Sequence, residues 1–238
     1  MIIWFFVSGF IATVIGTVAG FGVATILLPV ALLFFDFKTA LVLVALLHLF
    51  GSLSRISFFK NGIDWRKTVF FGIPGLIASV AGAALVTFVN QALLQLLLGV
   101  FLGAYAIFAF LEPKFKLKAS VQSMVIGGTS SGFLSGLIGA GGALRSVFLT
   151  AYRMPKESYI ATSAILAVII DGARIPVYLG NGLLVSSYYW MLPVLFILAV
   201  GSVFVGKRIA KNIPNKAFTR LVLVCLLLIG IKLIADAL

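Results

Sequence analysis

The chain has 238 residues, of which 62% are hydrophobic and 10% charged, and its formal net charge is +12. A soluble domain of this length cannot bury so much apolar surface, so the composition excludes an ordinary soluble protein and indicates a chain solvated by lipid. The apolar runs lack the alternating polarity of barrel strands, and the positive charges lie in short loops, which favours an α-helical membrane protein over a nucleic-acid binder.

The first apolar stretch, 2–35, begins without the basic region of a cleavable signal peptide, so we expect a retained membrane segment. This stretch and a second one, 121–152, are too long for one ordinary span of roughly 20 residues. Each is interrupted by glycines, at 20–22 and at 139–142. The other apolar runs each suit one crossing and lie at 40–59, 69–89, 93–111, 160–179, 188–206 and 218–235.

Features that recur 119 residues apart predict an internal duplication. The first membrane repeat then covers 1–111, a cytoplasmic linker covers 112–119, and the second repeat covers 120–238. Asn61-Gly62 also matches Asn181-Gly182 with a slip of one residue. The matched pairs are Gly20 with Gly139, Arg55 with Arg174, Pro74 with Pro193, and Gly82 with Gly201.

The loop charges predict the direction of the two repeats. Basic residues gather at 60–67, in the linker 112–119 and at 207–220, whereas 180–187 has no charge. Basic loops prefer the cytoplasm, and all three share one face only if each glycine-broken stretch enters and returns on the same side. Each half is then a glycine-broken hairpin plus three transmembrane helices, which makes the repeats inverted. Eight plain crossings are the alternative.

The glycine breaks are the first candidate site. A short helix that begins inside the membrane presents free N–H groups and a partial positive charge, which suit an anion. We therefore predict that Gly20, Gly22, Gly139, Gly141 and Gly142 contact a substrate. The alternative is that these glycines only permit close helix packing.

Asp171 and Arg174 lie three residues apart within one apolar run and share a helix face. Charges inside a span are costly and tend to face the interior of the bundle. We predict Arg174 as the countercharge for an anion and Asp171 as a coupling residue or as the partner in an ion pair. Arg55 is the repeat mate of Arg174, but Ser52 stands where Asp171 would be.

Further polar residues are weaker candidates. Arg145 could coordinate an anion, although reaching lipid headgroups is the favoured interpretation, and His48 fits a packing role better than a proton relay. The hydroxyls of Thr162 and Ser163 are predicted to bind substrate if they face a cavity. No catalytic motif and no metal-ligand cluster is present, so we expect neither an enzyme nor a cofactor.

Two stretches and one motif resemble the sulfite exporter TauE/SafE family. They are 131–142, the degenerate copy 16–29, and Asp171-x-x-Arg174-x-x-x-Tyr178, with Thr162-Ser163 nearby. The resemblance covers nearly the whole chain and implies a secondary transporter of small anions, with sulfite and sulfur-containing organic acids as the usual substrates. The first half has Gly-Phe-Gly where the second has Gly-Ala-Gly-Gly, so the two half-sites are expected to bind unequally.

Together these observations predict an all-α polytopic protein of the cell (inner) membrane. It would move a small anion, sulfite or a sulfur-containing organic anion, by alternating access. A channel-like, uncoupled anion permease is the alternative. The expected partners are the substrate and the lipid bilayer, without nucleic acid, and a homo-oligomer is compatible with the sequence.

Overall fold

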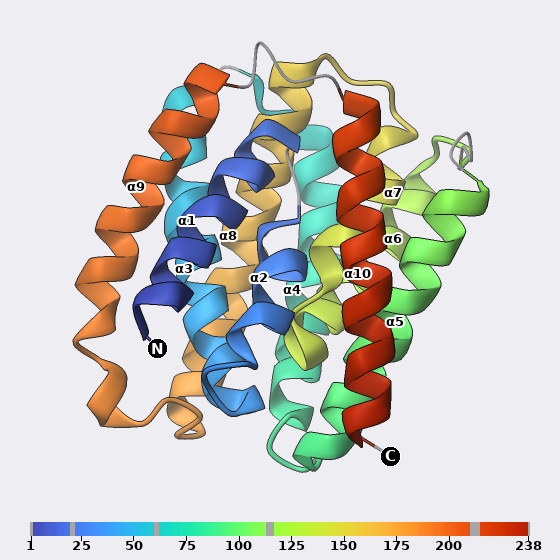
Figure 1. The fold of residues 1–238 in the computed structure, drawn as a ribbon. Helices are drawn as coiled ribbons and strands as arrows, with labels where there is room; N and C mark the ends of the chain where they lie inside the picture. Colours follow the sequence, from blue (N-terminus) through green and yellow to red (C-terminus); the bar gives the residue numbers. More distant parts are fainter. Residues whose placement is uncertain (1, 20–21, 60–61, 113–116, 210–214, 238) are drawn as a thin grey trace.

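The computed structural model describes residues 2–19, 22–59, 62–112, 117–209 and 215–237, without the side chains of 19 and 215–222. Within these ranges the regular structure is entirely helical (Figure 1). The helices are α1 (Ile2–Ala19), α2 (Val23–Ala31), α3 (Phe37–Phe59), α4 (Trp65–Leu85), α5 (Gln91–Leu111), α6 (Val121–Ile138), α7 (Gly141–Thr150), α8 (Lys156–Gly180), the short 3-10 helix η2 (Ser186–Tyr188), α9 (Met191–Ile209) and α10 (Asn215–Ala237).

Both long apolar stretches are broken where the glycines predicted. Gly22 precedes α2 with φ 95°, and Gly139 ends α6 with φ 71°, a left-handed conformation that glycine adopts without steric cost. Gly20 lies outside the described residues. In Figure 1 both ends of the α1–α2 pair lie toward the lower side, and both ends of the α6–α7 pair lie toward the upper side.

Five helices of the described part of the chain are long and apolar enough to cross a membrane: α3, α4, α5, α8 and α9. They correspond to five of the predicted spans. The sixth predicted span, 218–235, lies in α10, where some side chains are outside the description. Among the described residues, the helices of the two broken stretches are not among the five.

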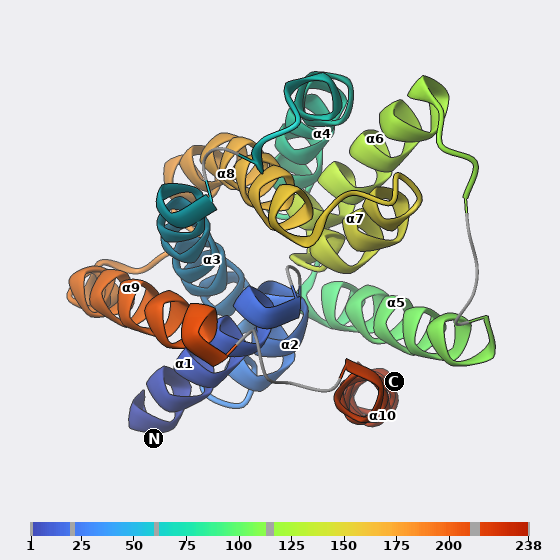
Figure 2. The ribbon, with the colours of Figure 1, turned by 90° about the horizontal axis from the view of Figure 1, so that it is seen from above.

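The centre of the bundle is the contact between α3 and α8 (Figure 2). Helix α4 packs on α8 and α6, while α9 packs on α3 and α1, and α5 pairs with α10. Helix α3 is buried along most of its N-terminal two thirds, including Leu41, Leu43 and Leu47. This packing places one central helix from each predicted repeat directly against the other.

A stripe of small residues joins α6 to α4. Gly128, Gly132 and Gly136 recur every four residues on one face of α6, and each lies against a backbone carbonyl of α4. A methyl group on Gly132 would overlap the carbonyl oxygen of Gly75. These glycines, of which Gly132 and Gly136 belong to the motif 131–142, therefore allow close packing, whereas Gly139 allows the break.

The predicted pair Gly82 and Gly201 has unlike surroundings. A Cβ on Gly82 would meet the backbone of α6 at Phe133, but Gly201 has open space around it. Gly206 is a glycine of α9 that packs closely, because a Cβ there would lie 3.1 Å from the carbonyl oxygen of Val14 in α1. Phe133 and Val14 are 119 residues apart, and Gly82 and Gly206 are 124 apart. The correspondence of Gly82 with Gly201 stays a prediction.

We predict that Gly132→Ala lowers the free energy of unfolding in detergent by about 1–3 kcal/mol, because the added methyl group must separate α6 from α4. Gly103→Ala is the matched control, since a Cβ at Gly103 meets nothing within 4 Å and alanine is the better helix former. Thermal unfolding of both purified variants measures the difference. Equal midpoints would contradict the packing assignment.

Candidate functional site

The second helix break lies inside the bundle, against α2 and α3. Helices α2 and α7, which follow the breaks, contact each other. A Cβ on Gly139 would lie 2.8 Å from the side chains of Leu28 in α2 and Leu41 in α3. The start of α7 is buried, from Ala140 through Ala143. The short helices therefore begin in the protein interior, away from lipid, as non-helical backbone at membrane depth requires.

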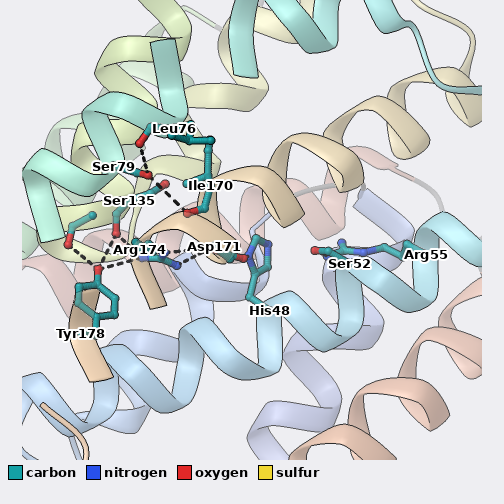
Figure 3. A network of polar contacts seen from close by, with 11 residues as sticks. His48, Ser52, Arg55, Leu76, Ser79, Ser135, Ile170, Asp171, Arg174 and Tyr178 are labelled. Atoms are coloured by element: carbon teal, nitrogen blue, oxygen red, sulfur yellow. Dashed lines mark hydrogen bonds and ion pairs between the residues drawn. The ribbon is translucent and has the colours of Figure 1, made fainter. Parts of the chain in front are cut away.

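Asp171 lies at the centre of a buried polar cluster beside these breaks (Figure 3). Its Oδ1 accepts a hydrogen bond of 2.9 Å from Arg174 Nε and lies 2.8 Å from Arg174 Nη2. His48 Nδ1 lies 2.6 Å from the other carboxylate oxygen, Oδ2. An ionised carboxylate only accepts, so His48 donates. The predicted ion pair between Asp171 and Arg174 is confirmed, and His48 links it to α3.

Arg174 also holds the end of α6. Its Nη1 donates to the carbonyl oxygen of Ser135, and the hydroxyl of Tyr178 donates to that of Gly136. Both carbonyls belong to the last turn of α6, where carbonyl acceptors run short of N–H partners. The carbonyl of Ser135 also accepts from the backbone N–H of Gly139, at 3.1 Å. The side chains of α8 thus satisfy the backbone at the point where the chain breaks before α7.

Arg55 makes a similar contact in the first half. Its Nη1 donates to the carbonyl oxygen of Gly16 in α1, at 3.3 Å, and its Nη2 donates to Ser52 Oγ at 2.8 Å. Gly16 and Ser135 lie 119 residues apart, as Arg55 and Arg174 do. Arg55 lacks an acidic partner because Ser52 stands where the second half has an aspartate.

Arg145 is buried, with 3% of its surface exposed, so the favoured interpretation that it reaches lipid headgroups is wrong. Its Nε has no hydrogen-bond partner among the described residues. The side chain stays inside because α7 is itself enclosed, contacting α6, α8 and α2. The position of Arg145 directly after the second glycine break was visible in the sequence. The burial of its side chain depends on the neighbouring helices and was not.

Buried positive charge exceeds buried negative charge. Asp171 is the only one of the chain's six acidic residues that is buried, whereas Arg55, Arg145 and Arg174 each have 3% or less of their surface exposed. An arginine within a span costs about 2.5–3.5 kcal/mol on insertion scales, and an uncompensated buried charge is strongly destabilising. Among the described residues the protein interior therefore carries a net positive charge, which favours binding of an anion.

The predicted glycines have different surroundings. A Cβ on Gly141 would overlap the carbonyl of Ser131 and the hydroxyl of Ser135, so Gly141 packs tightly on α6. A Cβ on Gly142 would meet only Arg145 Nη2, at 3.8 Å. Gly22 has similar room, its nearest neighbour being Ile26 at 3.8 Å. Of the predicted glycines in the second half, Gly142 is thus the one open toward a cation.

Thr162 lies apart from this cluster. Its hydroxyl accepts a hydrogen bond of 3.0 Å from the backbone N–H of Asp64, the N-cap of α4. Ser163 is buried on the same helix, α8, and also has an interaction partner. Substrate binding by either hydroxyl stays a prediction. Within the described residues no group of three or more histidine, cysteine or acidic side chains could hold a metal ion.

Comparison with known proteins identifies the family. The model of the sulfite exporter TauE/SafE family matches residues 5–233, nearly the whole chain. The chain belongs to this family. It is also 26% identical over 232 residues to a probable membrane transporter protein of Methanocaldococcus jannaschii, covering 88% of this chain and 86% of that protein. No solved structure matches. This TauE/SafE family member is therefore a multi-pass membrane transporter, which is consistent with a non-enzyme.

We predict that Arg174→Met and Asp171→Asn each destabilise this family member by about 3–5 kcal/mol, because each leaves a buried charge without its partner. The double variant should cost less than the sum of the two single losses. Thermal unfolding of the four proteins of this double-mutant cycle measures the coupling. Strictly additive losses would show that the pair contributes no interaction energy.

Proposed function

We propose that this protein is a secondary transporter of a small anion. The observation that carries the proposal is the buried cluster of three arginines and one carboxylate beside two helix breaks. A transporter that must bind, release and rebind an anion needs uncompensated positive charge in its interior, and helix N-termini add partial positive charge there. Family membership and the relative described as a probable membrane transporter support the same conclusion.

The substrate we propose is sulfite or a sulfur-containing organic anion. The family's description as sulfite exporters supports this choice. The site would include the backbone at Gly20, Gly22, Gly139, Gly141 and Gly142. The side chains proposed to complete it on α8 are Arg174, with Asp171 as its partner, and the hydroxyls of Thr162 and Ser163.

We further propose inverted repeats and alternating access. Each break would be the tip of a hairpin, with the α1–α2 hairpin entering from one face and the α6–α7 hairpin from the other, and Figure 1 supports this arrangement. The matched contacts of Arg55 with Gly16 and of Arg174 with Ser135 support a shared design of the two halves. Two such halves around one site can expose it to each face in turn.

The distribution of exposed charge supports the orientation. Helices α5, α7 and α9 end toward the upper side of Figure 1, and the exposed residues Lys118, Arg153 and Arg208 belong to the end of α9 or to the connections that follow α5 and α7. Helix α10 ends toward the lower side, and in its last turns Lys232 pairs with Asp236. Lys38, at the start of α3, is two residues from Asp36 in the sequence. The side with unbalanced positive charge would be cytoplasmic.

Cysteine labelling tests this topology. In a Cys225→Ala background, we expect Ser187→Cys to react with an impermeant maleimide added to intact cells, while Lys118→Cys and Arg208→Cys react only after the membrane is opened. All three positions are exposed on the protein. Eight plain crossings would instead place 118 and 208 on opposite faces, so labelling of only one of them in intact cells would contradict the hairpins.

We expect Gly142→Val to reduce sulfite flux at least tenfold while leaving the fold intact, because the new side chain would fill the space beside Arg145 without meeting backbone. Flux into proteoliposomes measures this. Gly201→Val is the matched control, since its surroundings are also open and it lies in α9, away from the breaks. Wild-type flux in Gly142→Val would exclude Gly142 from the path.

An uncoupled, channel-like anion permease is the alternative mechanism. The same proteoliposomes separate the two, because only a coupled transporter accumulates sulfite against its gradient when a proton gradient is imposed with the membrane voltage clamped at zero. Equilibration without accumulation would favour the permease.

A further inference from the structure

We propose that Arg145, with the hydroxyl of Tyr159 and the N-terminus of α7, is the primary anion-binding site, and that Arg174 is a positioning residue. This inference rests on the proposed function and assigns the substrate contact within it. The ligand would be a small oxyanion with at least two oxygen acceptors, because the donors come from a guanidinium, a phenol and backbone N–H groups.

The three buried arginines differ in what their donors already contact. Arg174 binds Asp171, Ser135 and Tyr178, so its charge is neutralised and its hydrogen bonds are used. Arg55 has no acid, but it donates to two backbone carbonyls and to Ser52. Arg145 has no hydrogen bond or ion pair among the described residues, although it is buried. Each guanidinium carries five N–H donors, and Arg145 is the one of the three whose donors have no partner among the described residues.

A second unpartnered polar group lies close to Arg145. The hydroxyl of Tyr159, near the start of α8, is buried and has no hydrogen-bond partner among the described residues. Tyr159 packs against the apolar cluster that contains Leu149, which lies one helical turn after Arg145 on the same face of α7. A buried polar group without a partner costs free energy comparable to a lost hydrogen bond, so two such groups together indicate a missing ligand.

The N-terminus of α7 completes the site. The helix begins at Gly141 behind Ala140, and no side chain caps its first turn although that turn is buried. The N–H groups of a first helical turn lack the usual partners within the helix. In α7 the N–H of Ala143 donates to the carbonyl of Ala140, at 3.3 Å, which leaves those of Gly141 and Gly142 for a ligand. Arg145 Nη2 lies beside this turn, 3.8 Å from where a Cβ on Gly142 would stand. A guanidinium and a helix N-terminus therefore face the same space, and both favour an anion.

The other charged groups near Arg145 do not compensate it. Asp171 and Arg174 both act on Arg145 electrostatically, but they are paired with each other. The equivalent position in α2, 119 residues earlier, is Ile26. The anion site thus belongs to the second half of the chain.

The first test compares stability without ligand. Arg145→Met should raise the thermal unfolding midpoint, because it removes an uncompensated buried charge, whereas Arg174→Met should lower it by breaking an ion pair. A purely structural Arg145 would behave like Arg174, so a lowered midpoint in Arg145→Met would overturn the assignment.

The second test measures binding of sulfite by the purified protein, through the ligand-dependent rise in the unfolding midpoint. We expect Arg145→Gln to weaken binding roughly tenfold or more, and Tyr159→Phe to weaken it about fivefold, as loss of a charged and of a neutral hydrogen bond predict. Arg145→Lys should retain part of the affinity, and Arg66→Gln, which removes an exposed charge, should retain all of it.

The outcomes separate this inference from the proposed function. Wild-type affinity in Arg145→Gln would overturn the role of Arg145 while leaving anion transport in place. If the wild-type protein neither binds nor transports sulfite, sulfate, sulfoacetate or simple carboxylates, the proposed function fails, and the assignment of Arg145 fails with it.

Discussion

The interior of this protein depends on one carboxylate, Asp171. One carboxylate oxygen of Asp171 accepts a hydrogen bond from His48 of α3, and the other accepts from Arg174 of its own helix, α8. Asp171 therefore connects α3 with α8. Arg174, held in this way, reaches the last carbonyls of α6 together with Tyr178. A helix can end inside a membrane only if its free carbonyls find partners, and these side chains supply them. The break before α7 therefore rests on a charge pair in a neighbouring helix.

Glycine serves distinct purposes in this fold, and the motif that resembles the family contains all of them. Gly139 adopts a positive φ and ends α6. Gly128, Gly132 and Gly136 allow α6 to approach α4, where any side chain would overlap backbone. Neither a positive φ nor a close backbone contact requires glycine at position 142, because its φ is not positive and a Cβ there would meet only Arg145. Local geometry thus does not require glycine at position 142. This residue lies beside the unpartnered guanidinium of Arg145.

Arg55 and Arg174 make similar backbone contacts, but their charges are compensated differently. Arg55 and Arg174 make corresponding contacts with the ends of α1 and α6, yet only Arg174 has an acidic partner. The second half adds Arg145, where the first half has Ile26. Both differences leave positive charge buried without compensation. Buried positive charge without a partner destabilises the ligand-free protein. An anion bound in the interior would compensate that charge.

The sequence by itself determined the helical membrane architecture, both breaks and the Asp171–Arg174 pair, because long apolar runs, glycines and a three-residue spacing act locally. Tertiary structure decided the rest. His48 contacts Asp171 although the two residues are 123 positions apart in the sequence, so no local pattern could indicate their contact. Gly206 packs closely against α1 whereas Gly201 has open space around it, a difference that only the neighbouring helices decide. Arg145 is buried rather than lipid-facing because α2, α6 and α8 enclose α7, and only packing decides which residues lose their contact with solvent and lipid.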